Sequence, residues 1–282
     1  MSPRVAVVTD STAYLPEGVA EQYDVGVVPL HVVLGRRTGV EGLQVSPGDV
    51  ARALQERRVE VSTSRPTPAE LVAAYRASGA KQVVSVHLSA SLSGTLDAAV
   101  LAARAVEPEG IEVRVVDSRT IAMGLGFAVI AASQAAASGA SVQEVEQAAR
   151  EAAAKTSIIL YVDTLEHLRK GGRIGAAAAL LGTALAVKPL LHVVKGAIAP
   201  LEKVRTTTRA LARLEELSVR AAGEGPVGVA VHHLAAVERA GELAERLRSR
   251  VPELQALHVS EVGAVVGAHV GPGALAVVVS RR

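Results

Sequence analysis

Apolar runs of strand length alternate with amphipathic runs of helix length through the first half of the chain. Strands are predicted at the apolar runs 5–9, 25–34, 82–88 and 111–116. Helices are predicted over 47–57, 68–77 and 94–106, and in an alanine-rich segment over 120–137. Strands that are apolar throughout and alternate with helices are typical of a parallel sheet covered by helices on both faces.

Local capping signals predict where several helices begin. Ser46 and Thr67 each place a hydroxyl side chain directly before a proline, which suits the first helical position. Ser141 has Glu144 three positions later, the arrangement of a capping box, and predicts a helix over 142–155.

The pattern changes after residue 155. A strand is predicted over 157–162, then a polar segment that ends at two glycines, and a hairpin whose strands are 190–194 and 197–201. Further helices are expected over 207–221 and 236–250, with strands near 227–231, 255–260 and 274–279. We therefore expect an α/β protein with two domains, an N-terminal parallel-sheet α/β domain over 1–156 and a smaller C-terminal α/β domain over 157–282.

Composition narrows the range of partners. The 282 residues carry 30 basic and 28 acidic side chains, and only 2% are aromatic. Single-stranded nucleic acid is usually bound by aromatic side chains beside a basic groove, so nucleic acid is not an expected partner. The chain has no cysteine, which excludes disulfides and cysteine-based metal sites, and its histidines are scattered, so no metal is expected.

No targeting or membrane segment is apparent. The apolar run at the start ends at Asp10, too early for a secretory signal. The weakly polar stretch 174–187 ends at Lys188, short of the ~20 residues that a membrane span requires. We expect a soluble cytoplasmic protein with no stable membrane insertion.

Hydroxyl side chains follow three of the predicted strands, in the segments 10–12, 89–95 and 117–118. Ligands of parallel sheets gather at the carboxyl ends of strands, where helices present their N-termini. Ser93, Gly94 and Thr95 stand where a helix should begin, and could bind an anion there; equally, Ser93 could simply cap that helix. Thr63 and Ser64 lie in a second hydroxyl-rich segment, which ends at Thr67. A role as helix cap explains Thr67, but it leaves Thr63 and Ser64 unexplained.

Other catalytic motifs are absent. The sequence has no phosphate loop, no dinucleotide-binding glycine motif after the first strand and no nucleophile elbow. A triad of Ser93, His269 and Asp117 can be drawn, but nothing in the spacing supports it. A serine-dependent acyl hydrolase or transferase that acts through Ser93 remains the alternative to a binding protein.

Seven segments, taken in order, resemble the DegV family. They are VVTDST at 7–12, TSRPTP at 63–68, SLSGT at 91–95, VDS at 116–118, LEHLRKGGRI at 165–174, KPLL at 188–191 and HVGPGA at 269–274. The family is known as long-chain fatty-acid binders, and its best-understood members are the lipid-binding subunits of bacterial fatty acid kinase.

The resemblance implies a non-catalytic protein that needs no cofactor. It binds a long-chain fatty acid inside the protein and presents the carboxylate to a separate ATP-dependent fatty acid kinase subunit, which forms the acyl-phosphate. Carried over by motif, Thr63 and Ser93 bind the carboxylate, and Gly94, Thr95, Arg205 and His269 are accessory contacts. Three positions depart from the residues usual in the family: Ala90, Arg65 and His167. These differences would affect contacts with the partner protein and the shape of the pocket.

Elementary energetics agree with such a ligand. Burying ~15 methylene groups at about 0.8 kcal/mol each contributes roughly 12 kcal/mol before the costs of association. A buried carboxylate is costly unless it is hydrogen-bonded, so hydroxyl groups such as Thr63 and Ser93 would offset that cost. A nearby Arg205 would favour the ionised carboxylate. The apolar segment 174–201 could line a tunnel for the acyl chain or could be ordinary core.

Overall fold

The computed structural model describes residues 5–56, 59–181 and 188–281. The chain divides into two compact units. The first comprises Met1–His31 and Ser64–Lys155, and the second comprises Val32–Thr63 and Thr156–Arg282. Each unit is built on its own main sheet.

The sheet of the first unit has four strands in the order β2-β1-β6-β7. These strands are β2 (Gly26–Val28), β1 (Val5–Asp10), β6 (Gln82–His87) and β7 (Glu112–Asp117). All three pairings are parallel, as the alternating pattern predicts. Parallel register brings the carboxyl ends of β1, β6 and β7 to one edge of the sheet, where Asp10, His87 and Asp117 lie.

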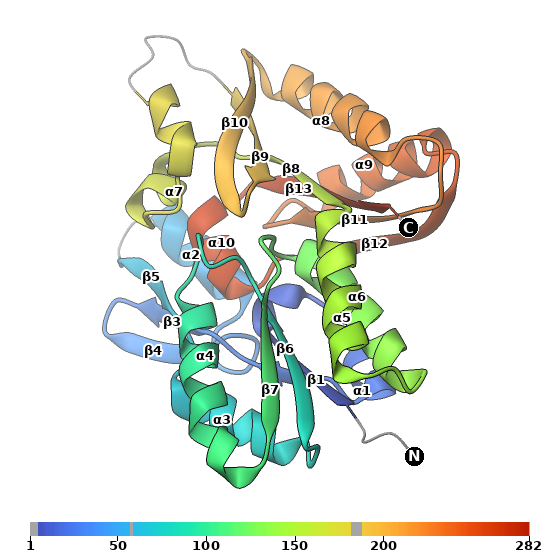
Figure 1. Ribbon diagram of the computed structural model, residues 1–282. Helices are drawn as coiled ribbons and strands as arrows, with labels where there is room; N and C mark the ends of the chain where they lie inside the picture. Colours follow the sequence, from blue (N-terminus) through green and yellow to red (C-terminus); the bar gives the residue numbers. More distant parts are fainter. Residues whose placement is uncertain (1–4, 57–58, 182–187, 282) are drawn as a thin grey trace. The chain divides into compact units, whose positions relative to one another are not determined.

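Helices cover both faces of this sheet (Figure 1). On one face lie α3 (Pro68–Ala77) and α4 (Thr95–Val106), and on the other α5 (Met123–Ala137) and α6 (Val142–Ala154). The unit also contains η1 (Ser11–Ala13), α1 (Val19–Tyr23) and η2 (Glu107–Glu109). Leu71 and Tyr75 of α3 and Ala98 of α4 are fully buried against strand residues such as Val8 and Val83. The small alanines of α4 let this helix lie close to the sheet.

The predicted caps form as expected. Thr67 and Glu70 make both hydrogen bonds of a capping box at the start of α3, as do Ser141 and Glu144 at the start of α6. These bonds satisfy backbone N–H groups that the first helical turn leaves without partners.

The sheet of the second unit has six strands in the order β10-β9-β8-β13-β11-β12. Its strands are β8 (Thr156–Tyr161), β9 (Lys188–Val194), β10 (Ala197–Val204), β11 (Val227–His233), β12 (Leu254–Glu261) and β13 (Leu275–Arg281). Only β11 and β12 pair in parallel, and the other pairings are antiparallel. The predicted hairpin is confirmed as β9 and β10, which turn at Lys195 and Gly196.

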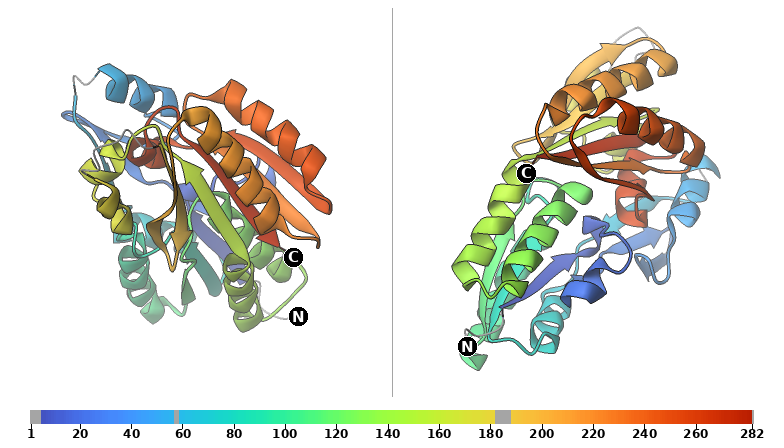
Figure 2. Two further views of the ribbon diagram at one scale, coloured as in Figure 1. Left: turned by 90° about the horizontal axis from the view of Figure 1, so that it is seen from above. Right: turned by 90° about the vertical axis from the view of Figure 1, so that its right-hand side faces the viewer.

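Two long helices, α8 (Thr207–Ala222) and α9 (Val237–Arg250), lie over the same face of this sheet (Figure 2). Leu214 of α8 and Leu243 of α9 are buried with Tyr161, Val229 and Val277 of the strands. This cluster is the main hydrophobic core of the second unit.

Short helices complete the second unit. These are α2 (Pro47–Glu56), α7 (Glu166–Lys170), η3 (Gly175–Leu180) and α10 (Ala264–Val270). Helix α10 packs against both α2 and α7. The buried Glu41 carboxylate accepts a 2.8 Å hydrogen bond from the backbone N–H of Val265, at the N-terminal end of α10.

The strand expected over 25–34 is interrupted. It divides into β2 and β3 (His31–Leu34), because Pro29 has no N–H group to continue a ladder. With β4 (Arg37–Val40) and β5 (Val61–Ser64), β3 forms a three-stranded sheet in the order β4-β3-β5.

The second unit includes one segment from the N-terminal half of the chain. The backbone changes unit after residue 155, and residues 32–63 pack with the second unit rather than with 1–31. Thr63 therefore belongs to the second unit. In the described part of the chain, no helix is long and apolar enough to cross a membrane.

Candidate functional site

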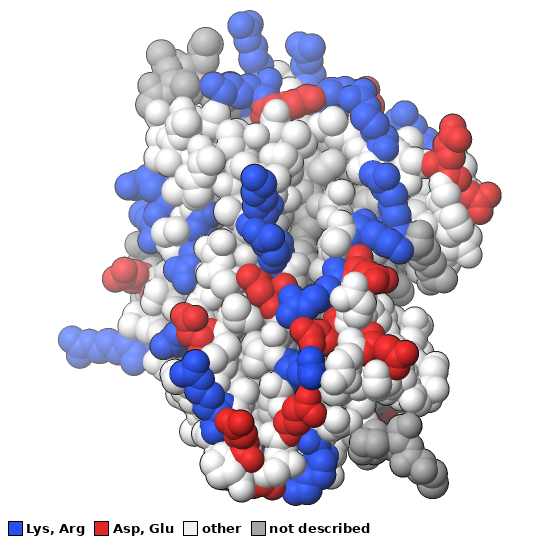
Figure 3. Space-filling view, viewed as in Figure 1, with Lys and Arg blue, Asp and Glu red and all other residues white. Residues whose placement is uncertain are grey.

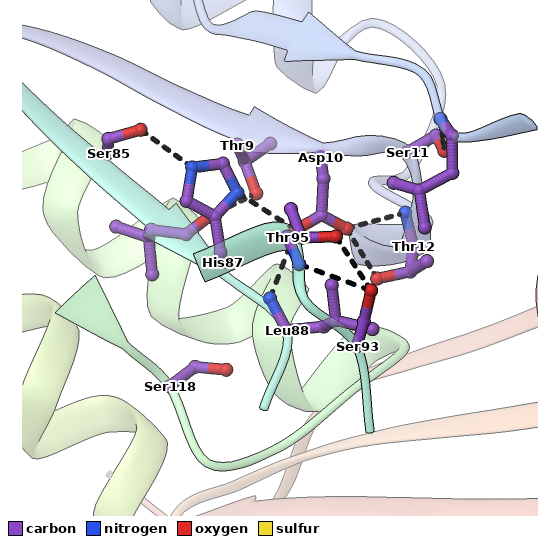
Figure 4. A network of polar contacts seen from close by, with 12 residues as sticks. Thr9, Asp10, Ser11, Thr12, Ser85, His87, Leu88, Ser93, Thr95 and Ser118 are labelled. Carbon is purple, nitrogen blue, oxygen red and sulfur yellow. Dashed lines mark hydrogen bonds and ion pairs between the residues drawn. The ribbon is translucent and has the colours of Figure 1, made fainter. Parts of the chain in front are cut away.

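The carboxylate of Asp10 joins the ends of β1 and β6 (Figure 4). Its Oδ1 accepts hydrogen bonds from the backbone N–H of Thr12 at 3.1 Å and from the Thr12 hydroxyl at 2.5 Å. Its Oδ2 accepts one from the backbone N–H of Leu88 and lies 3.0 Å from Nδ1 of His87. Asp10 and His87 are both fully buried, so this pairing replaces the hydration that the carboxylate loses.

The network continues through two hydroxyl groups. Nε2 of His87 lies 2.7 Å from the Ser85 hydroxyl, which lies 2.9 Å from the hydroxyl of Tyr75. An acid, an imidazole and a serine in this order resemble a hydrolase triad. Ser85 and Tyr75 are both fully buried, however, and burial raises the pKa of Tyr75 to about 12. The network therefore fixes two strand ends and offers no exposed nucleophile.

Sequence reasoning missed this network. Asp10 and His87 are 77 positions apart, and the pattern of apolar residues in β6 gives no sign that Ser85 and His87 contact each other or that His87 contacts Asp10. Only the parallel pairing of β1 with β6 brings them together. The one feature of the sequence that could have indicated this network is the hydroxyl side chains that follow the ends of these strands.

Ser93 lies in the turn between β6 and α4. Its hydroxyl lies 2.8 Å from the Thr95 hydroxyl and accepts a 3.3 Å hydrogen bond from the Thr95 backbone N–H. The capping position of α4 is Gly94, which provides no side-chain cap, so Ser93 is not the N-cap residue. Arg65 lies over Gly94, donating a 3.0 Å hydrogen bond to its carbonyl oxygen. A Cβ atom at Gly94 would lie 2.6 Å from Nη1 of Arg65, so a larger residue here would displace the end of the arginine side chain.

The three members of the drawn triad have other partners. Asp117 accepts hydrogen bonds from the backbone N–H groups of Ala90 and Arg119, and so holds the turn that precedes Ser93. Ser93 pairs with Thr95, and His269 pairs with Thr63. These contacts give Ser93 no general base to activate its hydroxyl.

The second unit contains a pocket of about 600 Å³ with Thr63 and His269 in its wall. The Thr63 hydroxyl, on β5, lies 2.8 Å from Nε2 of His269, on α10. Apolar side chains line part of the pocket and charged ones another part; the lining residues are Ala53, Leu54, Val59, Glu60, Val61, Ser62, Thr63, Glu166, His167, Lys170, Gly171, Arg173, Ala268 and His269. Such a volume and mixed lining are typical of small-molecule sites.

His269 is seated against the C-terminal end of α7. A Cβ atom at Gly171 would lie 2.0 Å from its Nδ1, so the imidazole rests directly on the glycine backbone. Nδ1 is buried and has no hydrogen-bond partner in the described residues. Burial, assisted by the positive charge of Arg173, lowers the pKa of His269 to about 4. The imidazole is therefore neutral at neutral pH.

The other predicted site residues lie elsewhere. Arg205 is exposed in the turn between β10 and α8, and it does not line the pocket. Its side chain makes no ion pair with the described residues. Ser93, Gly94 and Thr95 belong to the first unit, and Thr63, Arg205 and His269 belong to the second. Over the described residues, no cluster of three or more histidine and carboxylate side chains could hold a metal ion.

Comparison with known proteins gives consistent matches along the whole chain. A sequence model of the DegV family, described as uncharacterised proteins, matches residues 4–282. A DegV domain-containing protein of Streptomyces coelicolor is 58% identical over 285 residues, covering 100% of both chains.

Two solved structures are similar in both fold and sequence. The crystal structure of DegV, a fatty acid binding protein from Bacillus subtilis, superposes with a TM-score of 0.91 at 34% identity and covers 100% of both chains. A structure describing fatty acid binding by a DegV family protein from Thermus thermophilus has a TM-score of 0.91 at 30% identity, covering 99% of this chain and 100% of that one.

Proposed function

Because the chain belongs to the DegV family, we propose that it binds a long-chain fatty acid and presents the carboxylate to a separate ATP-dependent kinase. In this proposal Thr63 and Ser93 bind the carboxylate, and Gly94, Thr95, Arg205 and His269 contribute further contacts. The protein acts in the cytoplasm, is not itself catalytic and uses no cofactor.

The observation that carries the proposal is the pocket with Thr63 in its wall. Its volume of about 600 Å³ lies within the range of small-molecule sites. Leu54, Val59 and Ala268 supply apolar surface for a hydrocarbon chain, and Thr63 supplies a hydroxyl group. Similar proteins of known structure from Bacillus subtilis and Thermus thermophilus bind fatty acids.

The segment 174–201 is a second candidate for contacts with the acyl chain. Ala177, Leu180, Leu190 and Leu191 are buried in it. Residues 182–187 lie outside the described residues, so the tunnel expected over 174–201 stays a prediction. Affinity would come mainly from the tail, at about 0.8 kcal/mol for each buried methylene group.

Presentation to a kinase is the finer part of the proposal, and surface charge supports it. Lysine and arginine side chains gather over the β9–β10 hairpin and the start of α8 (Figure 3). Exposed residues of this surface are Lys195, Lys203, Arg205 and Arg209. A basic surface of this kind favours an acidic partner and speeds their encounter.

A serine enzyme acting through Ser93 is not favoured. The Ser93 hydroxyl pairs with Thr95, whose hydroxyl group is too weak a base to deprotonate a serine. The buried Ser85 has an imidazole partner but is inaccessible to a substrate.

Mass spectrometry of an organic extract from natively purified protein tests the proposed ligand. We expect one unmodified long-chain fatty acid per chain. If the extract is empty, added fatty acids should bind to the delipidated protein. A protein that takes up none of them, or that turns over acyl esters alone, would contradict the proposal.

A reconstituted reaction tests the kinase step. The loaded protein is combined with ATP and an ATP-dependent fatty acid kinase subunit, and acyl-phosphate is trapped with hydroxylamine. We expect product only when both proteins are present. A charge-reversal variant at Lys195 and Lys203, both outside the proposed carboxylate contacts, should slow the reaction without changing fatty-acid affinity by more than about threefold. Unchanged turnover by that variant would exclude the basic surface as the docking surface.

A further inference from the structure

Arg65 brings a positive charge to the turn that carries Ser93. We propose that its guanidinium group makes this turn prefer an ionised carboxylate, by holding the carbonyl group of Gly94 and by attracting, through space, an anion bound at Ser93. The attraction rests on the proposed function, in which Ser93 binds the carboxylate of the fatty acid. Arg65 is then a specificity-determining residue, and it belongs to the first unit together with Ser93, Gly94 and Thr95.

The backbone that carries Arg65 is fixed by its neighbours. Pro66 follows directly and restricts Arg65 to an extended backbone conformation. Thr67 comes next and begins α3 with a capping box. Because the backbone is restrained on this side, the guanidinium group reaches the turn from a defined position.

The guanidinium group makes two contacts with the start of α4. Nη1 of Arg65 donates a 3.0 Å hydrogen bond to the carbonyl oxygen of Gly94, which also accepts one of 3.2 Å from the backbone N–H of Ala98. The same Nη1 lies 3.9 Å from Oδ2 of Asp97. The positive charge is therefore held at the residue that directly follows Ser93.

Two carboxylates lie close to the same turn. Asp97 belongs to the first turn of α4, and Asp117 accepts a 3.3 Å hydrogen bond from the backbone N–H of Ala90. Both repel an anion bound at Ser93, and this repulsion grows as the distance decreases. A cation bonded to the turn offsets the repulsion, which gives Arg65 a role that a neutral donor cannot fill.

The exposure of Arg65 limits the size of this effect. Its side chain is 47% exposed, so water and salt screen its charge. At an ionic strength of 0.1 M the screening length is about 10 Å. The preference for the ionised carboxylate should therefore be moderate and should weaken as salt is added.

Carbon NMR of bound oleic acid, labelled with ¹³C at its carboxyl carbon, tests the attraction. At low salt, Arg65→Gln should raise the pKa of the ligand's carboxyl group by about 0.5, because it removes the charge but keeps a donor. Asp97→Asn should lower that pKa, and Arg65→Lys, which keeps the charge, should change it less than Arg65→Gln does. Arg76→Gln, at an exposed arginine of α3 that pairs with Glu109, is the matched control and should leave it unchanged. An unchanged pKa in Arg65→Gln, or a raised one in Asp97→Asn, would refute the attraction while oleic acid still binds.

Hydrogen exchange of the ligand-free protein tests the hold on the turn. The backbone N–H of Ala98 bonds to the Gly94 carbonyl group that Arg65 also binds. Arg65→Ala should raise the exchange rate at Ala98 about threefold, whereas Arg65→Gln and the control Arg76→Ala should change it less. A wild-type rate in Arg65→Ala would overturn this part, whether or not the protein binds fatty acids.

The two measurements separate failure of this role from failure of the proposed function. If wild-type protein binds no fatty acid, the proposed function fails and the attraction fails with it. The exchange rates then still decide whether Arg65 holds the turn.

Discussion

The Thr63 hydroxyl lies 2.8 Å from Nε2 of His269, although 206 positions separate the two residues in the chain. With the bond from Val265 N–H to Glu41, this contact joins both ends of α10 to the segment 32–63. The segment therefore contributes to the pocket wall and also restrains the helix opposite it.

Replacing the two predicted head-group hydroxyls should weaken fatty-acid binding without unfolding the protein. A hydrogen bond to a charged group contributes about 1.5–3 kcal/mol, so Thr63→Val with Ser93→Ala should lower affinity at least tenfold. Calorimetric titration with oleic acid measures this. Thr208→Val with Ser249→Ala, both at exposed positions, is the control. Wild-type affinity in the folded double variant would refute the head-group assignment.

Adding one methyl group at Gly171 should displace His269. The backbone of Gly171 has φ −75°, which alanine adopts freely, so the main obstacle is the imidazole, whose Nδ1 would lie 2.0 Å from the new Cβ atom. Gly171→Ala should reduce fatty-acid affinity about tenfold by disturbing the bond to Thr63. In contrast, Gly241→Ala in α9 meets nothing within 4 Å and should stabilise the fold by up to about 1 kcal/mol. Equal fatty-acid affinities of Gly171→Ala and Gly241→Ala would show that the contact between His269 and Gly171 does not affect fatty-acid binding.

Removing the Glu41 carboxylate should destabilise the second unit. Glu41→Ala leaves the buried N–H of Val265 without its acceptor, at a cost of about 1–3 kcal/mol in the free energy of unfolding. Glu41→Gln retains a carbonyl oxygen and should cost less. Urea unfolding compares both with Glu238→Ala, an exposed glutamate in the first turn of α9. The prediction is wrong if Glu41→Ala and Glu238→Ala unfold alike.

Stability should fall as the pH falls from about 6.5 toward 4. Burial lowers the pKa of both His232 and His269 from 6.5 to about 4. Between these values the unfolded chain binds more protons than the folded one, so acid favours unfolding. Each histidine contributes up to about 3 kcal/mol to this loss.

Urea unfolding over this pH range measures the effect. His232→Gln and His269→Gln should each flatten the dependence, because each removes one titrating group. The prediction fails if the slopes of both variants match the wild-type slope.

The Asp10 network should matter for the stability of the first unit. Asp10→Asn places an amide group among four hydrogen-bond donors and breaks a fully buried pairing with His87, at a cost of about 3–5 kcal/mol. Ser85→Ala should cost less, since it removes only the link between His87 and Tyr75. Thermal unfolding compares the stabilities of the two variants. If Asp10→Asn is as stable as Ser85→Ala, the Asp10 carboxylate does not make the larger contribution to the stability of the first unit.

Local patterns predicted much of the fold. The caps at Thr67 and Ser141 and the β9–β10 hairpin depend on residues close together in the chain. The parallel sheet of the first unit was predicted from the alternation of apolar strands with helices, although its paired strands are far apart in the chain. The break at Pro29 could also have been predicted, since proline cannot donate to a ladder.

Long-range contacts could not be predicted in this way. Glu41 and Val265 are 224 positions apart, and nothing in the amphipathic pattern of 32–63 indicates which sheet it joins. Thr63 and Ser93 were predicted as site residues from motif resemblance, but the seating of His269 on Gly171 depends on the packing of α7 against α10.

The division of the chain into two units also affects the order in which its parts can fold during synthesis. The backbone passes from one unit to the other three times, after residues 31, 63 and 155. During synthesis, residues 32–63 leave the ribosome long before α10, to which Glu41 and Thr63 bind. The first unit can fold before the partners of this early segment have been synthesised. Maturation of the pocket is therefore a late event in biosynthesis, and a nascent chain arrested before residue 264 should leave 32–63 open to proteases.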